Sequence, residues 1–166
     1  MKFRNIVFFL IVSLLLSGCG LLPDNTAVDE TLMQGYDYAS GVQNFSVLLN
    51  GVGLQVEAVD LRSSQRAGYT YLILSINAVN ESKDPVVPGG FILVDDALNE
   101  YVSQQTAPFA AELTDLPLAI NQGDSVAGHA VFEVPNSALQ ANLRLRWESD
   151  LHESRIEIFL GALPAV

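Results

Sequence analysis

Cysteine and basic residues are what this sequence has least of. A single cysteine among 166 residues excludes an internal disulfide and any metal site built from several cysteines. Only 8 Lys and Arg residues stand against 19 Asp and Glu residues, which gives a net charge of −11. A surface this acidic repels phosphate, so we expect no nucleic-acid partner. The hydrophobic content of 49% excludes a low-complexity disordered chain, and the length allows one ordinary domain.

Helical periodicity and phosphate-binding motifs are also missing. After the first 18 residues, no stretch repeats apolar residues at the spacing of a helix face. The sequence has no Gly-rich loop of the kind that cradles phosphate, and no basic patch with interleaved aromatic residues. These absences favour an all-β domain and argue against nucleotide chemistry.

The N-terminus has the organisation of a secretory signal. Lys2 and Arg4 form a positively charged start, and residues 6–16 are apolar apart from Ser13. This run is too short to span a bilayer. We therefore assign residues 1–18 to a signal peptide that is removed.

The residues before Cys19 resemble the lipobox of bacterial lipoproteins. In the order Leu16-Ser17-Gly18-Cys19, small residues occupy the two positions before the cysteine, as that processing requires. The resemblance implies that the Cys19 thiol receives a diacylglyceryl group, that the signal is cut before Cys19, and that the new amino group is acylated, for example with palmitate. Two or more acyl chains anchor a protein stably without a transmembrane helix.

The anchor implies a place in the cell envelope. Gly20, rather than an Asp that would retain the protein at the inner membrane, follows Cys19. We expect the outer membrane, facing the periplasm, in a Gram-negative cell, and otherwise the outer face of the plasma membrane. Loss of Lys2 and Arg4 leaves 6 basic and 19 acidic residues, a net charge of −13, so anionic headgroups repel the domain and the lipid holds it.

Residues 19–44 are predicted to be the lipidated cysteine and a flexible acidic tether. They show no sustained strand or helix period. A coil of this length has a reach of roughly 25–30 Å. Four apolar residues of this segment could instead form a short docking segment. They are Leu32, Met33, Tyr36 and Tyr38.

Residues 45–166 are predicted to form an immunoglobulin-like β-sandwich of about seven or more strands. Short apolar or alternating runs, separated by turn residues, mark these strands. The predicted strands cover residues 53–61, 69–79, 91–94, 100–102, 116–120, 125–134, 143–147 and 156–160. Because the domain lacks a cysteine pair, its core must hold by packing alone.

Alternation also predicts which side chains face the core. Leu54, Val56 and Ala58 share one face, and residues 69–79 are apolar enough to be buried on both faces. Pro117 places the strand 116–120 at a sheet edge.

The last two strands are expected to form a hairpin around the turn at residues 149–153. Leu143, Leu145 and Trp147 face the core on the first strand, as Ile156, Ile158 and Leu160 do on the second. Arg144 and Arg146 then face water, and one of them is expected to pair with Glu157 across the hairpin.

Three segments resemble the immunoglobulin-like domains of unknown function in bacterial lipoproteins and secreted proteins, which are similar to the mycobacterial immunoprotective extracellular protein fold. They are residues 69–80, residues 91–95 followed by Tyr101, and above all Gln122-Gly123-Asp124-Ser125 through Gly128 to Val131-Phe132-Glu133-Val134-Pro135. The resemblance implies a β-sandwich outside the cytoplasm, often lipid-anchored, and supplies no catalytic residues. Asn99 stands where the hairpin of that family commonly has Gly, which leaves the turn type open.

Ser125 is the best candidate nucleophile, and the pattern around it is incomplete. Gly123-Asp124-Ser125 matches the start of an esterase block, yet Asp150 and His152 have the wrong spacing for the partner pair. A turn that leads into a strand explains the same residues. His129, the other imidazole, is expected to be half-buried on its strand, so no zinc or copper site and no enzyme activity is predicted.

A calcium site at the hairpin of residues 95–99 is the one metal hypothesis that the sequence leaves, and it is a weak one. Asp95, Asp96, Asn99 and Glu100 offer hard oxygen ligands within six residues, but their spacing is not that of an EF-hand loop. No cofactor is expected.

The sequence favours a lipid-anchored, non-enzymatic binding or accessory module of the cell envelope with a protein partner. Its loops and edge strands are the surfaces available to such a partner. The alternative is an envelope sensor that binds a small ligand or calcium, and a hydrolase that uses Ser125 ranks last.

Overall fold

The computed structural model describes residues 35–87, 90–104, 107–161 and 163. Within these residues no helix is long and apolar enough to cross a membrane. The predicted signal peptide and Cys19 lie outside the described residues. The elements are β1 (Asp37–Val42), β2 (Val47–Leu49), β3 (Val52–Ser63), β4 (Tyr69–Asn80), β5 (Ile92–Val94), β6 (Glu100–Val102), η2 (Ala110–Glu112), β7 (Ser125–Pro135), η3 (Asn136–Gln140), β8 (Leu143–Ser149) and β9 (Ser154–Gly161).

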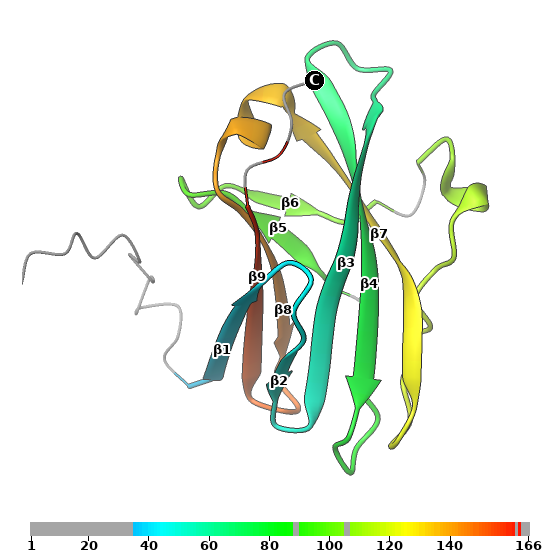
Figure 1. Cartoon of the computed structure of the whole chain (residues 1–166), viewed down its shortest axis with the longest axis vertical. Coiled ribbons are helices and arrows are strands. Elements are labelled where there is room, and N and C mark those ends of the chain that lie inside the picture. The colour runs from blue at the N-terminus through cyan, green and yellow to red at the C-terminus, as the bar shows by residue number, and fades with distance from the viewer. Residues whose placement is uncertain (1–34, 88–89, 105–106, 162, 164–166) are drawn as a thin grey trace, which may run out of the picture. The chain divides into compact units, whose positions relative to one another are not determined.

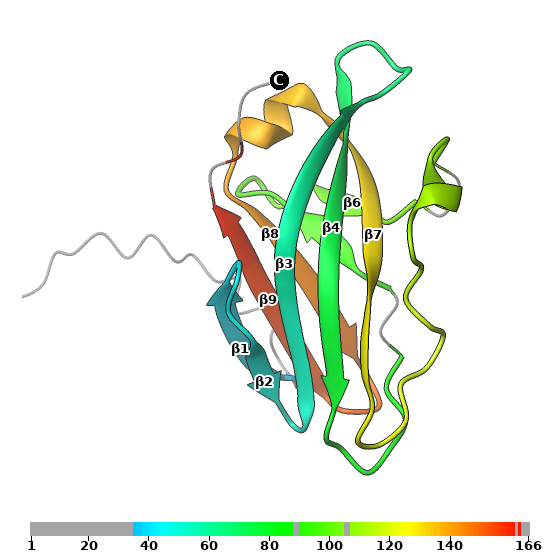
Figure 2. The same cartoon turned by 45° about the vertical axis from the view of Figure 1, so that its right-hand side comes forward.

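The strands form two sheets that pack face to face (Figure 1, Figure 2). One sheet has the order β1-β9-β8-β5-β6 and the other the order β2-β3-β4-β7. β1 runs parallel to β9, and the remaining strand pairs of the described residues are antiparallel. The predicted all-β, immunoglobulin-like sandwich of seven or more strands is confirmed.

The core lies between the sheets, where alternation along the strands predicted it. Trp147 is 1% exposed, and its indole Nε1 donates a hydrogen bond to the Val87 carbonyl over 3.1 Å. That bond satisfies the one polar group of the side chain, so the ring packs at no hydrogen-bond cost. The largest fully buried apolar side chains are Trp147, Phe132, Leu54, Leu72, Leu74, Ile76, Leu93, Ile120, Leu139, Leu143, Leu145 and Ile156.

The predicted face of β3 is right only for its first half. Leu54 and Val56 are buried, whereas Ala58 is exposed. The pairing of β3 with β4 shifts register between Val56 and Ala58. This β-bulge reverses the alternation, so that Val59 and Leu61 pack against the core instead.

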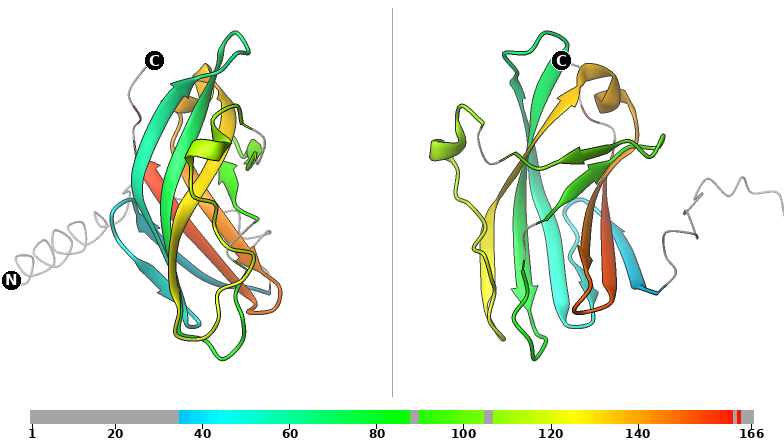
Figure 3. Two further views of the ribbon diagram at one scale, coloured as in Figure 1. Left: turned by 90° about the vertical axis from the view of Figure 1, so that its right-hand side faces the viewer. Right: turned by 180° about the vertical axis from the view of Figure 1, so that it is seen from behind.

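The continuous apolar run of β4 is buried on both faces at Thr70–Leu74, as predicted. Tyr71 and Ile73 point away from the main core and form a second, smaller cluster with Val131. The crossover between β6 and β7, which carries η2 and passes alongside β7 (Figure 3), covers this cluster. Phe109 of the crossover meets Tyr71 edge to face, with ring centroids 5.1 Å apart.

The prediction of a strand at residues 116–120 is wrong. Only isolated bridges form there, between Val86 and Ile120 and between Asp115 and His129. Pro117 has no backbone N–H to donate to a ladder, which limits pairing to single bridges. The segment nevertheless lies close to β7, because a Cβ on Gly128 would stand 2.8 Å from the Leu116 backbone nitrogen.

The predicted boundary between tether and sandwich at residue 44 is too late. Residues 37–42 form β1 and pair in register with β9 from Asp37–Ser154 to Val42–Phe159. The sandwich therefore begins by residue 37. Short alternation around Gly41 hid this strand, because polar and small residues occupy most of its positions.

The chain enters the sandwich at a defined end. The Asp37 backbone N–H donates to the Glu153 carbonyl over 2.6 Å, and the Asn50 side chain donates to the Asp37 carboxylate over 2.9 Å. The β8–β9 turn and the β2–β3 turn thus meet at the start of β1, whereas η3 and the β3–β4 turn lie at the opposite end (Figure 1).

Candidate functional site

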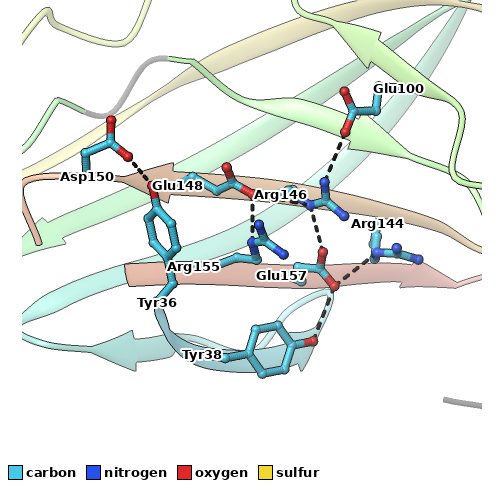
Figure 4. A network of polar contacts seen from close by, with 9 residues as sticks. All are labelled: Tyr36, Tyr38, Glu100, Arg144, Arg146, Glu148, Asp150, Arg155 and Glu157. Carbon is cyan, nitrogen blue, oxygen red and sulfur yellow. Dashed lines mark hydrogen bonds and ion pairs between the residues drawn. The ribbon is translucent and has the colours of Figure 1, made fainter. Parts of the chain in front are cut away.

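Charged side chains gather on the outer face of the five-stranded sheet (Figure 4). Alternation correctly places Arg144 and Arg146 of β8 and Glu157 of β9 on this face. The expectation that the arginines face water is wrong, because the side chains of Arg144, Arg146 and Glu157 are only 13%, 6% and 7% exposed. Long side chains lie across the sheet and cover one another.

Glu157 is the centre of this network. Its Oε1 accepts a hydrogen bond from Arg146 Nε over 2.8 Å, and its Oε2 lies 3.0 Å from Arg144 Nε. Arg146 and Glu157 are directly opposite in the β8–β9 register, and this confirms the predicted cross-strand pair. One carboxylate therefore stands between two guanidinium groups, away from bulk water.

A second ion pair extends the network toward the β8–β9 turn. Arg155 Nε lies 2.7 Å from Glu148 Oε1, and Arg146 Nε lies 3.8 Å from the same oxygen. Sequence reasoning missed Arg155, although its alternation with Ile156 and its position opposite Glu148 on the hairpin could have placed it here.

Two tyrosines from the start of the domain close one side of the network. Tyr38 donates a hydrogen bond to Glu157 Oε2 over 3.3 Å, and Tyr36 donates one to Asp150. Burial raises the pKa of Tyr38, and the hydrogen bond to Asp150 raises the pKa of Tyr36. Both belong to the docking segment that was the alternative to a free tether, whereas Leu32 and Met33 lie outside the described residues.

At its other side the network reaches the β5–β6 hairpin. Arg146 Nη1 donates a hydrogen bond to Glu100 Oε1 over 3.1 Å. The Glu100 side chain is 51% exposed, so this carboxylate is the part of the contact that solvent reaches. The predicted hairpin itself is confirmed, since Val94 lies opposite Glu100 in the β5–β6 register.

Asp95 organises the turn of this hairpin. Its Oδ1 accepts backbone hydrogen bonds from Ala97 and Asn99, and its Oδ2 accepts bonds from the Asn99 side chain and the Tyr101 hydroxyl. Burial opposes ionisation, but the bonds from Asn99 and the others outweigh it and lower the pKa of Asp95. Burial and the bond to Asp95 raise the pKa of Tyr101 to about 12. The left-handed residue is Leu98, at φ 63°, rather than Asn99.

The four candidate calcium ligands are thus engaged in different ways. Both oxygens of Asp95 accept hydrogen bonds within the turn, and Glu100 pairs with Arg146. Asn99 donates its amide to Asp95, while Asp96 is exposed. In the part of the chain that the structure describes, no three His, Cys, Asp or Glu side chains are grouped to hold a metal ion.

An open depression of about 600 Å³ lies beside the hairpin turn. It separates the β5–β6 hairpin from η3 and the residues next to it. Its walls combine carboxylates with small and apolar side chains, a mixture that fits a polar or cationic group better than an apolar one. The lining residues are Asp95, Asp96, Asn99, Glu100, Tyr101, Pro135, Ser137, Ala138 and Ala141.

The remaining candidates are dispersed over the sandwich. Ser125 is exposed at the start of β7, opposite Val79. His152 lies in the β8–β9 turn. Asp150 of the same turn accepts a hydrogen bond from the Tyr36 hydroxyl. His129 is half-buried, as predicted, with Nδ1 3.1 Å from the Thr114 carbonyl. These positions give the nucleophile hypothesis no support.

Comparison with known proteins finds similarity of fold rather than of sequence. No protein-family model and no curated protein sequence matches the chain. The ycdA protein of Bacillus subtilis, which has been proposed to be a lipoprotein, aligns with 70% of this chain at 16% identity and a TM-score of 0.56. The aligned region is 38% of that protein.

Two further solved structures align over most of their length. The yjhA protein of Bacillus subtilis matches at 14% identity over 74% of this chain and 99% of its own, with a TM-score of 0.54. The secreted protein MPT63 of Mycobacterium tuberculosis matches at 16% identity over 75% and 97%, with a TM-score of 0.46 that carries no argument by itself. At these identities the first two likenesses show a shared β-sandwich fold and no shared activity.

Proposed function

We propose that the chain is a lipid-anchored protein of the cell envelope whose β-sandwich is a non-enzymatic binding or accessory module for an envelope protein. The observation that carries the proposal is the Leu16-to-Cys19 motif directly after a signal-like segment. The fold shared with ycdA, itself proposed to be a lipoprotein, supports the same placement outside the cytoplasm.

The depression beside the β5–β6 hairpin is the surface that we propose for the partner. The chain enters the sandwich at the β8–β9 turn, whereas this hairpin lies toward η3, in the other half of the sandwich (Figure 1). An anchor attached at one end leaves the other half free to meet a partner. Asp96 and Glu100 offer exposed carboxylates there, so a partner with Lys or Arg side chains fits best.

The anchor is tested by changing Cys19. We expect the Cys19→Ala protein to leave the membrane fraction and to lose incorporation of labelled palmitate. Without the thiol the diacylglyceryl group cannot attach, and the processing that frees the amino group for acylation does not follow. Ser17→Ala keeps a small residue in the motif and is the matched control, which we expect to stay membrane-bound. Retention of Cys19→Ala in the membrane would contradict the lipid anchor.

The partner is tested by covalent crosslinking in living cells. Asp96→Lys reverses an exposed charge at the depression and spares Asp95, which the hairpin needs for its turn. We expect this variant to lose a crosslinked protein that the original chain captures. Asp60→Lys reverses the charge of an exposed residue on β3 and is the control. It should capture the same crosslinked protein unchanged. Equal capture by both variants would remove the depression as the interface.

The depression also keeps the sensor alternative testable. A ligand that binds the native state raises the melting temperature. A shift of the mature protein in millimolar Ca²⁺ that Asp96→Asn abolishes would favour a calcium-binding sensor. An unchanged melt would remove calcium from this role.

A further inference from the structure

The side of the sandwich formed by β1 and β2 differs in charge from the rest of the molecule. Residues 38–56 form the longest uncharged run of the chain after Cys19, although 25 of the residues after the signal are charged. The run includes β1 after its first residue, Asp37, all of β2 and the first part of β3. Apart from Asp37, the first residue of β1, the two strands of this side therefore carry none of the carboxylates that repel an anionic surface elsewhere on the domain.

Three large apolar side chains are exposed along this uncharged side. Val42, Phe45 and Leu48 are 53%, 67% and 57% exposed. A tight turn brings the first two together, because the Phe45 backbone N–H donates to the Val42 carbonyl over 3.2 Å. Leu48 lies opposite Gly53 in the β2–β3 register, where the neighbouring strand has no side chain to cover it. We call these three residues the β1–β2 edge.

The β1–β2 edge is also next to the proposed anchor in the chain. β1 is the first strand of the sandwich, and only residues 20–36 separate its start from Cys19. A flexible tether of this length, as the sequence predicts, has a reach of roughly 20–25 Å, so a lipidated Cys19 would keep β1 close to the bilayer. At such a high local concentration of lipid, a few apolar side chains suffice for contact.

We propose that the β1–β2 edge inserts Val42, Phe45 and Leu48 into the interface of the membrane that anchors the protein, an inference that rests on the proposed lipid anchor. A second copy of this chain is the less suitable occupant, because two mature domains of net charge −13 repel each other. The contact orients the sandwich with β1 and β2 toward the lipid. It leaves β6 and the depression, at the far edge of the five-stranded sheet, pointing away from it.

The test places a tryptophan at the edge of the lipidated protein. Phe45→Trp adds a fluorophore to a chain whose own Trp147 is buried and provides a constant background. Leu118→Trp replaces a large apolar residue that is 89% exposed and lies outside the two edge strands, and it is the matched control. Both proteins are reconstituted into phosphatidylcholine vesicles with either ordinary or brominated acyl chains.

We expect brominated chains to quench the added emission of Phe45→Trp and to leave that of Leu118→Trp unchanged. Flotation of the vesicles reports the anchor separately. Protein that floats without selective quenching at position 45 overturns the edge contact and leaves the anchor intact. Protein that does not float contradicts the proposed anchor and the inference with it. The indole of Phe45→Trp could also be protected from water to the same degree in detergent as in vesicles. That result, together with a dimer in sedimentation, would assign the edge to a second copy and would also overturn the proposal.

Discussion

Glu157 shows how one residue can hold several others in place. Its carboxylate accepts a hydrogen bond from Arg146 Nε and contacts Arg144 and Tyr38. The side chain of Glu157 is largely shielded from solvent, although it lies on the outer face of the sheet. Removing one member of a buried ion pair is costly because it leaves an uncompensated charge behind, even where the intact pair adds little stability. Without Glu157, Arg146 keeps its contacts with Glu100 and Glu148, whereas Arg144 loses the carboxylate of its described ion pair.

Glu157→Ala should therefore destabilise the domain by about 3–5 kcal/mol. The measurement is urea unfolding of the mature protein, with Glu157→Gln as the milder variant that keeps a hydrogen-bond acceptor for Arg146. Glu112→Ala is the matched control. It breaks the exposed pair with Arg62, in which the side chains are 41% and 66% exposed, and should cost about 0–1 kcal/mol. Equal costs for Glu157→Ala and Glu112→Ala would contradict the buried network.

Asp95 should make stability depend on acid pH. Its folded-state pKa is lowered, so its stabilising contribution is present above the unfolded-chain pKa of about 3.9 and is lost as the pH falls through the lower folded-state pKa. We expect the difference in unfolding free energy between the original protein and Asp95→Asn to be largest near neutral pH and to shrink below about pH 4. A difference that stays constant through this range would mean that the turn does not need the charge.

β1 is the element whose assignment differs most between sequence and structure. Its six residues look like linker, yet they pair with β9 along their whole length. Ala39 packs against the core, and Tyr38 reaches Glu157. A domain cut at residue 45, the boundary that the sequence predicts, would remove β1 and leave β9 as an edge strand paired with β8 alone.

We expect a domain that starts at residue 45 to be less stable than one that starts at residue 35. The loss should be roughly 2 kcal/mol or more, since both apolar contacts and strand pairing disappear. Thermal melts of the two purified domains measure the difference. A third domain that starts at residue 37 separates the contribution of Tyr36 from that of the strand. Identical melting temperatures for starts at 35 and 45 would contradict a structural role for β1.

Sequence patterns predicted those elements whose side chains alternate without interruption. Leu143, Leu145 and Trp147 reach the core in the expected register, and the hairpin around residues 95–99 forms where turn residues gather. Ala58 was misplaced because a bulge adds one residue to β3, and alternation carries no sign of that. The residues 116–120 were misassigned because an apolar run with a proline can pack along an edge without pairing.

The candidate sites were less predictable, because they depend on which strands become neighbours. The pair of Arg146 and Glu157 lies within one hairpin, and alternation predicted that Glu157 pairs with either Arg144 or Arg146. The burial of these arginines, and the contact of Arg146 with Glu100, require β5 and β6 to lie beside β8. That order joins segments 46 residues apart, which local patterns do not report.

At the scale of the whole molecule, two electrostatic effects oppose each other. Without the proposed signal peptide the chain carries a net charge of −13, and this self-repulsion destabilises the compact state. The ion pairs of the outer sheet face stabilise it, and salt screens them less because their arginines are buried. Added salt should therefore weaken mainly the repulsion between exposed charges and change the stability of the ion pairs less.

The melting temperature of the mature domain should accordingly rise when NaCl is increased from a few millimolar to about 0.15 M, where the screening length is about 8 Å. Differential scanning calorimetry at neutral pH measures the shift, and Glu157→Ala should show a rise of similar size. A fall in melting temperature with salt would mean that the ion pairs, rather than the net charge, dominate.

The parallel pairing of β1 with β9 has a mechanical consequence. Tension between the proposed membrane anchor and the proposed partner on the sandwich would enter the fold at Asp37 and act along β1. The register from Asp37–Ser154 to Val42–Phe159 is then loaded in shear, so that its hydrogen bonds resist together instead of opening one at a time. The pairing of β1 with β9 would thus resist the pulling of β1 out of the sandwich.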